Sequence, residues 1–186
     1  MAVTHVIHHT ILNTLHSVCF SIVIQKELRA VGPRKNCEHL PLPTIEDFAG
    51  YTGGHTHRKW RQVGHEWRCP SCKRTKFEQL TWTQQRRDNG RVPTGRFIWL
   101  APIVEHHDHG AIRGLRHPRF APTLLCFDCN IAEGRVKRVL RLPSDFSFSP
   151  EELNAFITGY PHRRVTENLD IAAQIAERVI RLANAG

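Results

Sequence analysis

The apolar positions along the chain predict helices in its C-terminal half. Apolar side chains recur every three or four residues from about residue 168 to residue 184, which predicts an amphipathic helix. A second helix is predicted over residues 150–159, because Ser149 can cap it, Pro150 suits its first position and Glu152 can complete a capping box. We expect both helices to be packing elements rather than carriers of chemistry.

Shorter apolar runs predict strands. Residues 97–104 combine aromatic and β-branched side chains, which favours a buried strand, and residues 123–125 predict a second one. A further helix is expected from Asp128 or Cys129 to about Leu140. Together these elements predict an α+β fold.

Other stretches have the composition of loops and linkers. The polar residues 84–95, which include Asn89-Gly90, are predicted to form a loop. Residues 31–66 are rich in Pro, Gly, His and basic side chains, which predicts a linker or an extended arm. Within it, the Thr44–Asp47 segment could cap one short helical turn.

The first 25 residues are apolar but lack the positive n-region and the small-residue cleavage site of a signal peptide. Histidines and an asparagine interrupt the run, which argues against a membrane span and leaves a membrane anchor as the alternative. We expect them to form an appended helix or strand. The predicted organisation is an N-terminal extension and linker over residues 1–43, a central domain over residues 44–145 and a helical segment over residues 146–186.

The charge favours a polyanionic partner. The chain has 26 Lys+Arg against 17 Asp+Glu, a formal net charge of +9, and nucleic acid is the simplest partner for such a chain. The basic residues around Trp60 fit either a nucleic-acid contact or a solvated loop that carries one core tryptophan. A merely basic protein remains the alternative.

Four of the six cysteines fall into two CxxC pairs, which indicates metal binding rather than a disulfide framework. A tetrahedral zinc ion needs four such ligands, and the two pairs supply them. The predicted ligands are Cys69, Cys72, Cys126 and Cys129. Four buried cysteines without a metal are the alternative.

A run of imidazoles and carboxylates, Glu105–His109, follows the first predicted strand. Hydrolysis of a phosphodiester needs a base to activate water, a cation to stabilise charge and a positive surface to hold the substrate. A neutral histidine suits the base, and a second side chain could hold the cation. Taken alone, the run fits a histidine-rich surface turn or a second zinc site equally well.

The spacing of these motifs resembles a known family. The run EHHDH (Glu105–His109), followed by LLCFDCNIAEG (Leu124–Gly134), is similar to the phage recombination endonuclease VII branch of the HNH nucleases, also called ββα-metal or His-Me finger nucleases. The resemblance covers the two CxxC pairs and about residues 97–140. It implies a small ββα-metal core on a four-cysteine zinc site, in the cytoplasm of a bacterium or a phage-infected host cell.

The resemblance also implies roles for single residues. His107 takes the position of the general base, and Asn130 that of the metal ligand on the helix. His106 stands where this branch usually has an aspartate ligand, and Glu105 or Asp108 could supply that carboxylate instead. His109 matches a second histidine that contacts phosphate or supports the site. The expected catalytic cation is Mg²⁺ or Mn²⁺, and an imidazole ligand favours the latter.

The sequence therefore predicts a metal-dependent DNA endonuclease, with a structural zinc ion, no membrane association and a homodimer as one option. The expected nucleic-acid contacts are Arg113, Arg116, Arg119 and Lys137. Two alternatives stay open: a catalytically inactive zinc-dependent DNA-binding protein, and an RNase of the same fold.

Overall fold

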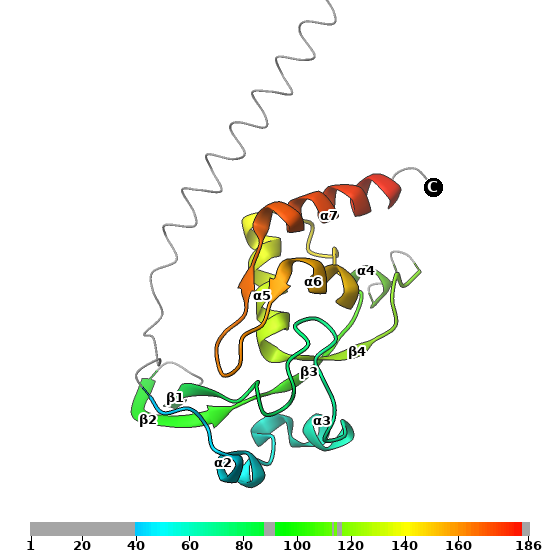
Figure 1. The fold of residues 1–186 in the computed structure, drawn as a ribbon. Coiled ribbons are helices and arrows are strands. Elements are labelled where there is room, and N and C mark those ends of the chain that lie inside the picture. The colour runs from blue at the N-terminus through cyan, green and yellow to red at the C-terminus, as the bar shows by residue number, and fades with distance from the viewer. Residues whose placement is uncertain (1–39, 88–91, 113, 115–116, 184–186) are drawn as a thin grey trace, which may run out of the picture. The chain divides into compact units, whose positions relative to one another are not determined.

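The computed structural model describes residues 40–87, 92–112, 114 and 117–183, all within the unit that spans Cys37–Gly186 (Figure 1). The element expected over residues 1–25 lies outside the described residues, as do Arg113 and Arg116. The helices are α2 (Ile45–Gly50), the 3-10 helix η1 (Gly54–Thr56), α3 (His57–Gln62), α4 (His109–Ile112), α5 (Phe127–Val139), α6 (Pro150–Phe156) and α7 (Leu169–Ala183). The strands are β1 (Thr81–Arg87), β2 (Val92–Leu100), β3 (Ile103–His106), β4 (Thr123–Cys126), β5 (Ile157–Thr158) and β6 (Thr166–Glu167).

The strands of the described residues pair into short antiparallel sheets: β1 with β2, β3 with β4, and β5 with β6. The expected α+β class is confirmed at this level. The predicted strand at 123–125 is β4, and the helix expected from residue 128 or 129 is α5.

The single buried strand expected over residues 97–104 is wrong. The chain changes partner at Ala101-Pro102, so that β2 pairs with β1 while β3 pairs with β4. A proline cannot donate to a strand ladder, which suits it to this break. Phe97 and Ile98 are 37% and 40% exposed, because the two-stranded β1–β2 ribbon leaves part of its surface open to solvent.

The loop expected over residues 84–95 is also largely wrong, since β1 extends to Arg87 and β2 begins at Val92. Polar side chains are compatible with these strands because an antiparallel ribbon can face water. The register shifts between Gln84 and Arg86, which interrupts the regular pairing of the two strands.

The region expected to be a linker contains α2, η1 and α3. The capping box predicted for Thr44 and Asp47 is present at the start of α2. Trp60 on α3 is buried, and Tyr51 contacts it edge to face with ring centroids 4.8 Å apart. The Tyr51 hydroxyl accepts a hydrogen bond from the Ala101 backbone N–H at 3.0 Å, so this segment packs on the β2–β3 junction.

The predicted C-terminal helices are present. Ser149 and Glu152 form a capping box with Pro150 at the start of α6, as expected, but α6 ends at Phe156 because the chain enters β5 there. Phe156 packs edge to face on Phe148, with ring centroids 4.9 Å apart. The buried side of α7, which includes Ile175, packs against α6.

The two strands of the β3–β4 hairpin are joined by α4 and the residues after it, and α5 follows β4 directly and packs on both strands (Figure 1). The end of β3 and the inner side of α5 are therefore neighbours. No helix among the described residues is long and apolar enough to cross a membrane.

Two glycines give a matched test of this packing. A Cβ at Gly159 would lie 2.8 Å from Cys72 Cβ and 2.9 Å from the Cys72 carbonyl oxygen, whereas a Cβ at Gly134 would meet nothing within 4 Å. Gly159→Ala should therefore lower the melting temperature. Gly134→Ala should stabilise the protein by up to about 1 kcal/mol, because Gly134 is an exposed residue inside α5. Thermal unfolding of both variants checks this, and equal effects would contradict the close approach of Gly159 to Cys72.

Candidate metal centre and histidine cluster

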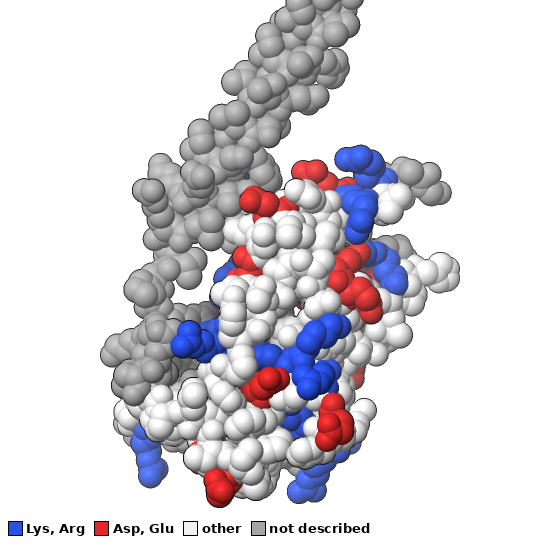
Figure 2. Space-filling model, in the orientation of Figure 1, with Lys and Arg blue, Asp and Glu red and all other residues white. Residues whose placement is uncertain are grey.

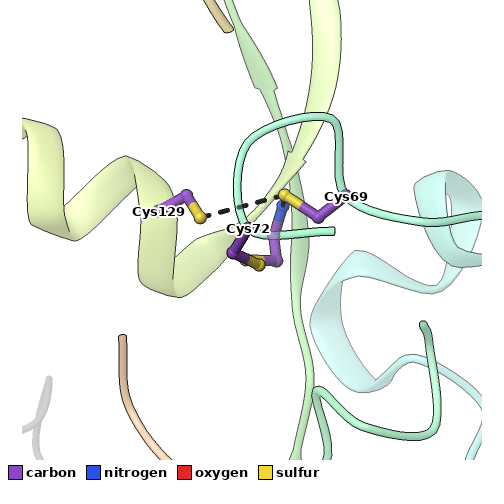
Figure 3. A group of neighbouring side chains, drawn as sticks. Cys69, Cys72 and Cys129 are labelled. Carbon is purple, nitrogen blue, oxygen red and sulfur yellow. Dashed lines mark hydrogen bonds between the residues drawn. The ribbon is translucent and has the colours of Figure 1, made fainter. Parts of the chain in front are cut away.

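The two CxxC pairs come together. Sγ of Cys69 lies 3.8 Å from Sγ of Cys129 (Figure 3). Sγ of Cys72 lies 3.7 Å from Sγ of Cys126. Sulfurs bound to one zinc ion at about 2.3 Å in a tetrahedron are about 3.8 Å apart. All four side chains are buried, and no other group of three or more metal-binding side chains of this kind occurs in the described part of the chain. The cluster could hold a metal ion such as zinc.

Local backbone geometry directs these thiols inward. The Cys69 N–H donates to the Arg74 carbonyl at 2.9 Å, and the Lys73 N–H donates to the Cys69 carbonyl at 2.8 Å. Lys73 has φ 61°, the left-handed conformation that such a tight turn requires. On the other side, Cys126 is the N-cap of α5 and Cys129 lies in its first turn. A turn and a helix start thus each present two thiols.

A buried arginine lies against the cluster. The Arg74 side chain donates from Nε to Cys72 Sγ at 3.3 Å and from Nη2 to Cys126 Sγ at 3.6 Å. Nη2 also donates to Asp128 Oδ2 at 3.1 Å. Hydrogen bonds from Cys126 and Cys129, together with the charge of Arg74, lower the pKa of the Cys72 thiol. The surroundings therefore favour a thiolate at Cys72, which is the form that binds metal.

The histidine turn begins with His106, the last residue of β3, which is 2% exposed. Its Nε2 lies 2.7 Å from the Phe148 carbonyl oxygen, so Nε2 carries the proton and donates. Nδ1 then holds a lone pair and faces Glu133 Oε2 at 3.5 Å. Burial lowers the pKa of His106, which keeps the imidazole neutral.

Glu133 on α5 completes this arrangement. It is 4% exposed, and its Oε1 accepts from the Phe148 N–H at 3.1 Å. His106 and Glu133 thus bind both polar groups of the Phe148 backbone. Burial raises the pKa of Glu133, although the nearby charge of Lys137 and the bond from Phe148 oppose this. The pair has a clear structural use in holding the segment before α6.

The rest of the predicted catalytic residues lie around this pair. His107 is half-buried, and its ring centroid is 5.1 Å from that of His109. Burial, with the charge of Lys137, lowers the pKa of His109. Asn130 is half-buried in the first turn of α5, and on a helix it projects within about 20° of Lys137 and about 60° of Glu133. Asn130, Glu133 and Lys137 therefore share one side of α5.

Other candidates have different positions. Asp108 is 2% exposed and accepts from the backbone N–H groups of Gly110 and Arg119, at 3.2 and 2.9 Å. Glu105 is exposed and pairs across the sheet with Leu124. The Arg119 guanidinium donates to the Ser147 carbonyl at 2.8 Å and to Glu152. These contacts give Arg119 a structural role beside α6, and its expected phosphate contact stays a prediction.

Sequence reasoning missed two residues of these clusters. Glu133 lies inside the motif on which the resemblance rests, and its spacing of three residues from Asn130 was a usable signal. Arg74 had no comparable signal. Its position next to a CxxC pair does not distinguish a buried guanidinium from the solvated basic residues around it.

Comparison with protein families, with curated proteins and with solved structures found no match for this chain. The arrangement of its own residues therefore carries the functional argument.

Replacing one cluster thiol tests the metal centre. Cys129→Ser should lose the bound metal and unfold at much lower temperature, because structural zinc sites contribute folding free energy directly. Cys37→Ser, outside both CxxC pairs, is the matched control and should keep about one zinc per chain. Elemental analysis and thermal unfolding measure both effects. Equal zinc content in the two variants would contradict a four-cysteine site.

The buried His106 predicts a pH dependence of stability. Its folded-state pKa is lowered, so its contribution is complete above the unfolded value of about 6.5 and is lost as pH falls below it. The free energy of unfolding should drop by up to about 1.4 kcal/mol per pH unit for this one proton. His106→Gln keeps a donor for the Phe148 carbonyl but does not titrate, so its stability should fall less between pH 7 and 5. Identical slopes for variant and parent would contradict a buried neutral His106.

Proposed function

We propose that this chain is a metal-dependent endonuclease that hydrolyses phosphodiester bonds of DNA. The observation that carries the proposal is the meeting of β3 and α5. There, the lone pair of His106 Nδ1 faces Glu133 on the side of α5 that also bears Asn130 and Lys137. Half-buried His107 lies directly after His106 in the chain. A neutral imidazole, a carboxylate and an amide together suit a cation. The second imidazole beside them suits a general base.

In this proposal the four cysteines bind zinc, which serves folding. Four thiolates in a closed tetrahedron leave no position for substrate, and this is the pattern of structural rather than catalytic zinc. The ion would join the turn at Cys69–Cys72 to the first turn of α5. It would thereby hold α5 against β3 and keep Asn130 and Glu133 beside the histidine turn.

A second cation, Mg²⁺ or Mn²⁺, would be held by His106 Nδ1 and the Asn130 amide oxygen, with Glu133 as a further oxygen ligand. The donor set fits such an ion, since imidazole together with oxygen ligands suits Mn²⁺ and also permits Mg²⁺. The hydrogen bond from Nε2 to the Phe148 carbonyl would orient the ring, as ligating histidines usually require. A cation here supplies charge stabilisation for the phosphate and the departing oxygen.

His107 is the general base in this proposal. It would take the proton of the attacking water, a role that suits an imidazole at neutral pH. His109, whose ring is 5.1 Å from that of His107, would contact phosphate or support His107. Lys137 on α5 adds positive charge on the same side of the helix as Asn130.

One observation favours a second candidate, a catalytically inactive zinc-dependent DNA-binding protein. His106 and Glu133 already bind the backbone of Phe148, so their burial has a structural reason without any catalytic cation. The two candidates differ in whether they cleave DNA. Both would use the metal centre for folding and basic side chains for DNA binding. An RNase of the same fold differs only in substrate, and a panel of plasmid, branched DNA and RNA separates it.

The first test removes the base. His107→Ala should lower the cleavage rate by about 10²–10⁴-fold while zinc content and DNA affinity stay near those of the parent, because a general base acts in the transition state. His65→Ala is the matched control, since His65 is a solvent-exposed histidine with a side chain 80% exposed. Plasmid nicking under single-turnover conditions measures the effect. Equal cleavage by His107→Ala and the parent would favour a different base.

The second test concerns the cation. Asn130→Ala should raise the concentration of Mn²⁺ or Mg²⁺ needed for half-maximal cleavage, because it removes an oxygen ligand. Asn130→Asp, which keeps that oxygen, should retain activity at low metal concentration. Metal titrations of both variants decide the point. A cleavage rate of Asn130→Ala that matches the parent at every metal concentration would remove Asn130 from the site.

A further inference from the structure

A basic surface lies over the turn that carries Cys69 and Cys72, and its residues come from segments other than the histidine turn. It is formed by exposed side chains from two segments distant in sequence, the residues around that turn and the loop between β5 and β6. We call it the knuckle surface, and its residues are Arg68, Lys73, Tyr160, Arg163 and Arg164. Figure 2 shows blue side chains gathered near the middle of one face, where Figure 1 draws the segment between α3 and β1.

The two segments are held together by part-buried side-chain hydrogen bonds and by one backbone hydrogen bond. Arg74 Nη1 donates to the carbonyl oxygens of Arg163 and Tyr160, at 2.6 and 3.4 Å. The His162 N–H donates to the Glu78 carbonyl at 2.7 Å, and its Nδ1 lies 3.1 Å from the Leu80 carbonyl. The loop is therefore fixed on the cysteine turn before any partner arrives, which reduces the ordering cost of binding.

The surface keeps an excess of positive charge. Arg68 and Arg164 have side chains 62% and 50% exposed, and each approaches a carboxylate only at 3.9 Å, Glu78 and Asp128 respectively. Exposed pairs at this separation contribute little and exchange easily for another anion. Asp128 is also bound more closely by Arg74, at 3.1 Å, which partly neutralises it.

We propose that the knuckle surface binds the phosphate backbone of nucleic acid, and specifically duplex DNA. Arg68 Nη1 donates to the Lys73 carbonyl and Lys73 Nζ to the Pro70 carbonyl, and the other donors of the four exposed cationic side chains are offered to successive phosphates. A positive surface on a chain of net charge +9 complements a polyanion. Tyr160 is 49% exposed among them and offers a hydroxyl and an aromatic ring to sugar and phosphate. The inference rests on the proposed function only in choosing DNA as the polyanion.

The consequence is a link between the metal centre and DNA binding. Arg74 touches the thiols of Cys72 and Cys126 with Nε and Nη2, and it holds the β5–β6 loop with Nη1. The cysteine cluster that holds the start of α5 in place therefore also holds the β5–β6 loop through Arg74, and with it part of the knuckle surface. DNA affinity should depend on the zinc ion even where cleavage is not measured.

The test compares two double variants with the same change of charge. Arg163→Ala with Arg164→Ala removes two cations from the knuckle surface, while Arg178→Ala with Arg181→Ala removes two exposed cations from α7. Fluorescence anisotropy with a labelled DNA duplex gives the dissociation constant over a series of salt concentrations. Zinc content and circular dichroism establish that each protein is folded. If the double variant does not fold, the single variant Arg163→Gln replaces it in the same binding measurement.

For each phosphate that the knuckle variant no longer neutralises, we expect the slope of log affinity against log salt to decrease by about 0.9 and the affinity at 0.1 M salt to fall about tenfold. The α7 variant should show a much smaller decrease. Equal decreases in both double variants would mean that only net charge matters and would overturn the proposal. Unchanged DNA affinity of the knuckle variant would also overturn the proposal. Binding to phosphatidylserine vesicles is measured for the same variants, and a loss of vesicle binding with unchanged DNA affinity would assign the surface to a membrane instead of DNA.

The same samples separate this inference from the proposed function. Plasmid nicking is measured for the parent and for the knuckle variant at saturating protein. A parent that binds DNA through this surface but cleaves no substrate would support the surface and contradict the nuclease. A knuckle variant that cleaves and binds as the parent does would leave the nuclease intact and refute the surface.

Discussion

The contact of four cysteine sulfurs is the constraint on which the rest of the described structure depends. It joins the turn at Cys69–Cys72 to the first turn of α5, across the whole β1–β2 ribbon and β3–β4 hairpin. Buried Arg74 lies against two of these thiols, and its Nη1 holds the loop before β6. Four thiolates around a divalent ion would carry excess negative charge, and because an unpaired buried charge is costly, the arginine and such thiolates would stabilise one another. The position of α5, and with it the side that bears Asn130 and Glu133, follows from this cluster.

The pair of His106 and Glu133 gives α5 a second anchor. Both residues bind the Phe148 backbone, so buried hydrogen bonds join the end of β3 and α5 to the segment before α6. Burial alone raises the pKa of Glu133 and favours its protonated form, whereas a cation beside His106 would favour the carboxylate. The same arrangement serves packing without a cation and would supply ligands to the proposed one. The burial of His106 and Glu133 is therefore compatible with both proposed functions, the nuclease and the inactive DNA-binding protein.

Local sequence signals predicted the local structure well. The capping boxes at Thr44 and Ser149, the helical spacing along α7 and the two CxxC pairs each depend on residues a few positions apart. The errors arose where distant segments decide the outcome. Pro102 marks a change of strand partner that an apolar run conceals. The sequence pattern also gave no sign that Arg74 and His106 bind the carbonyl groups of Arg163 and Phe148 far along the chain. Arg119 binds Glu152 on α6, another contact between distant segments that the sequence pattern does not reveal.

We propose that one metal ion folds the protein and that a second cation, Mg²⁺ or Mn²⁺, makes it a nuclease. The most direct measurement is nicking of supercoiled plasmid by protein that holds one zinc ion per chain and is otherwise free of metal, titrated with Mg²⁺ and, separately, with Mn²⁺. We expect no nicking with zinc alone and a saturable increase with either added ion, reached at lower concentration for Mn²⁺ because of the imidazole ligand. Full binding of the plasmid without nicking at any concentration of either ion would contradict the claim.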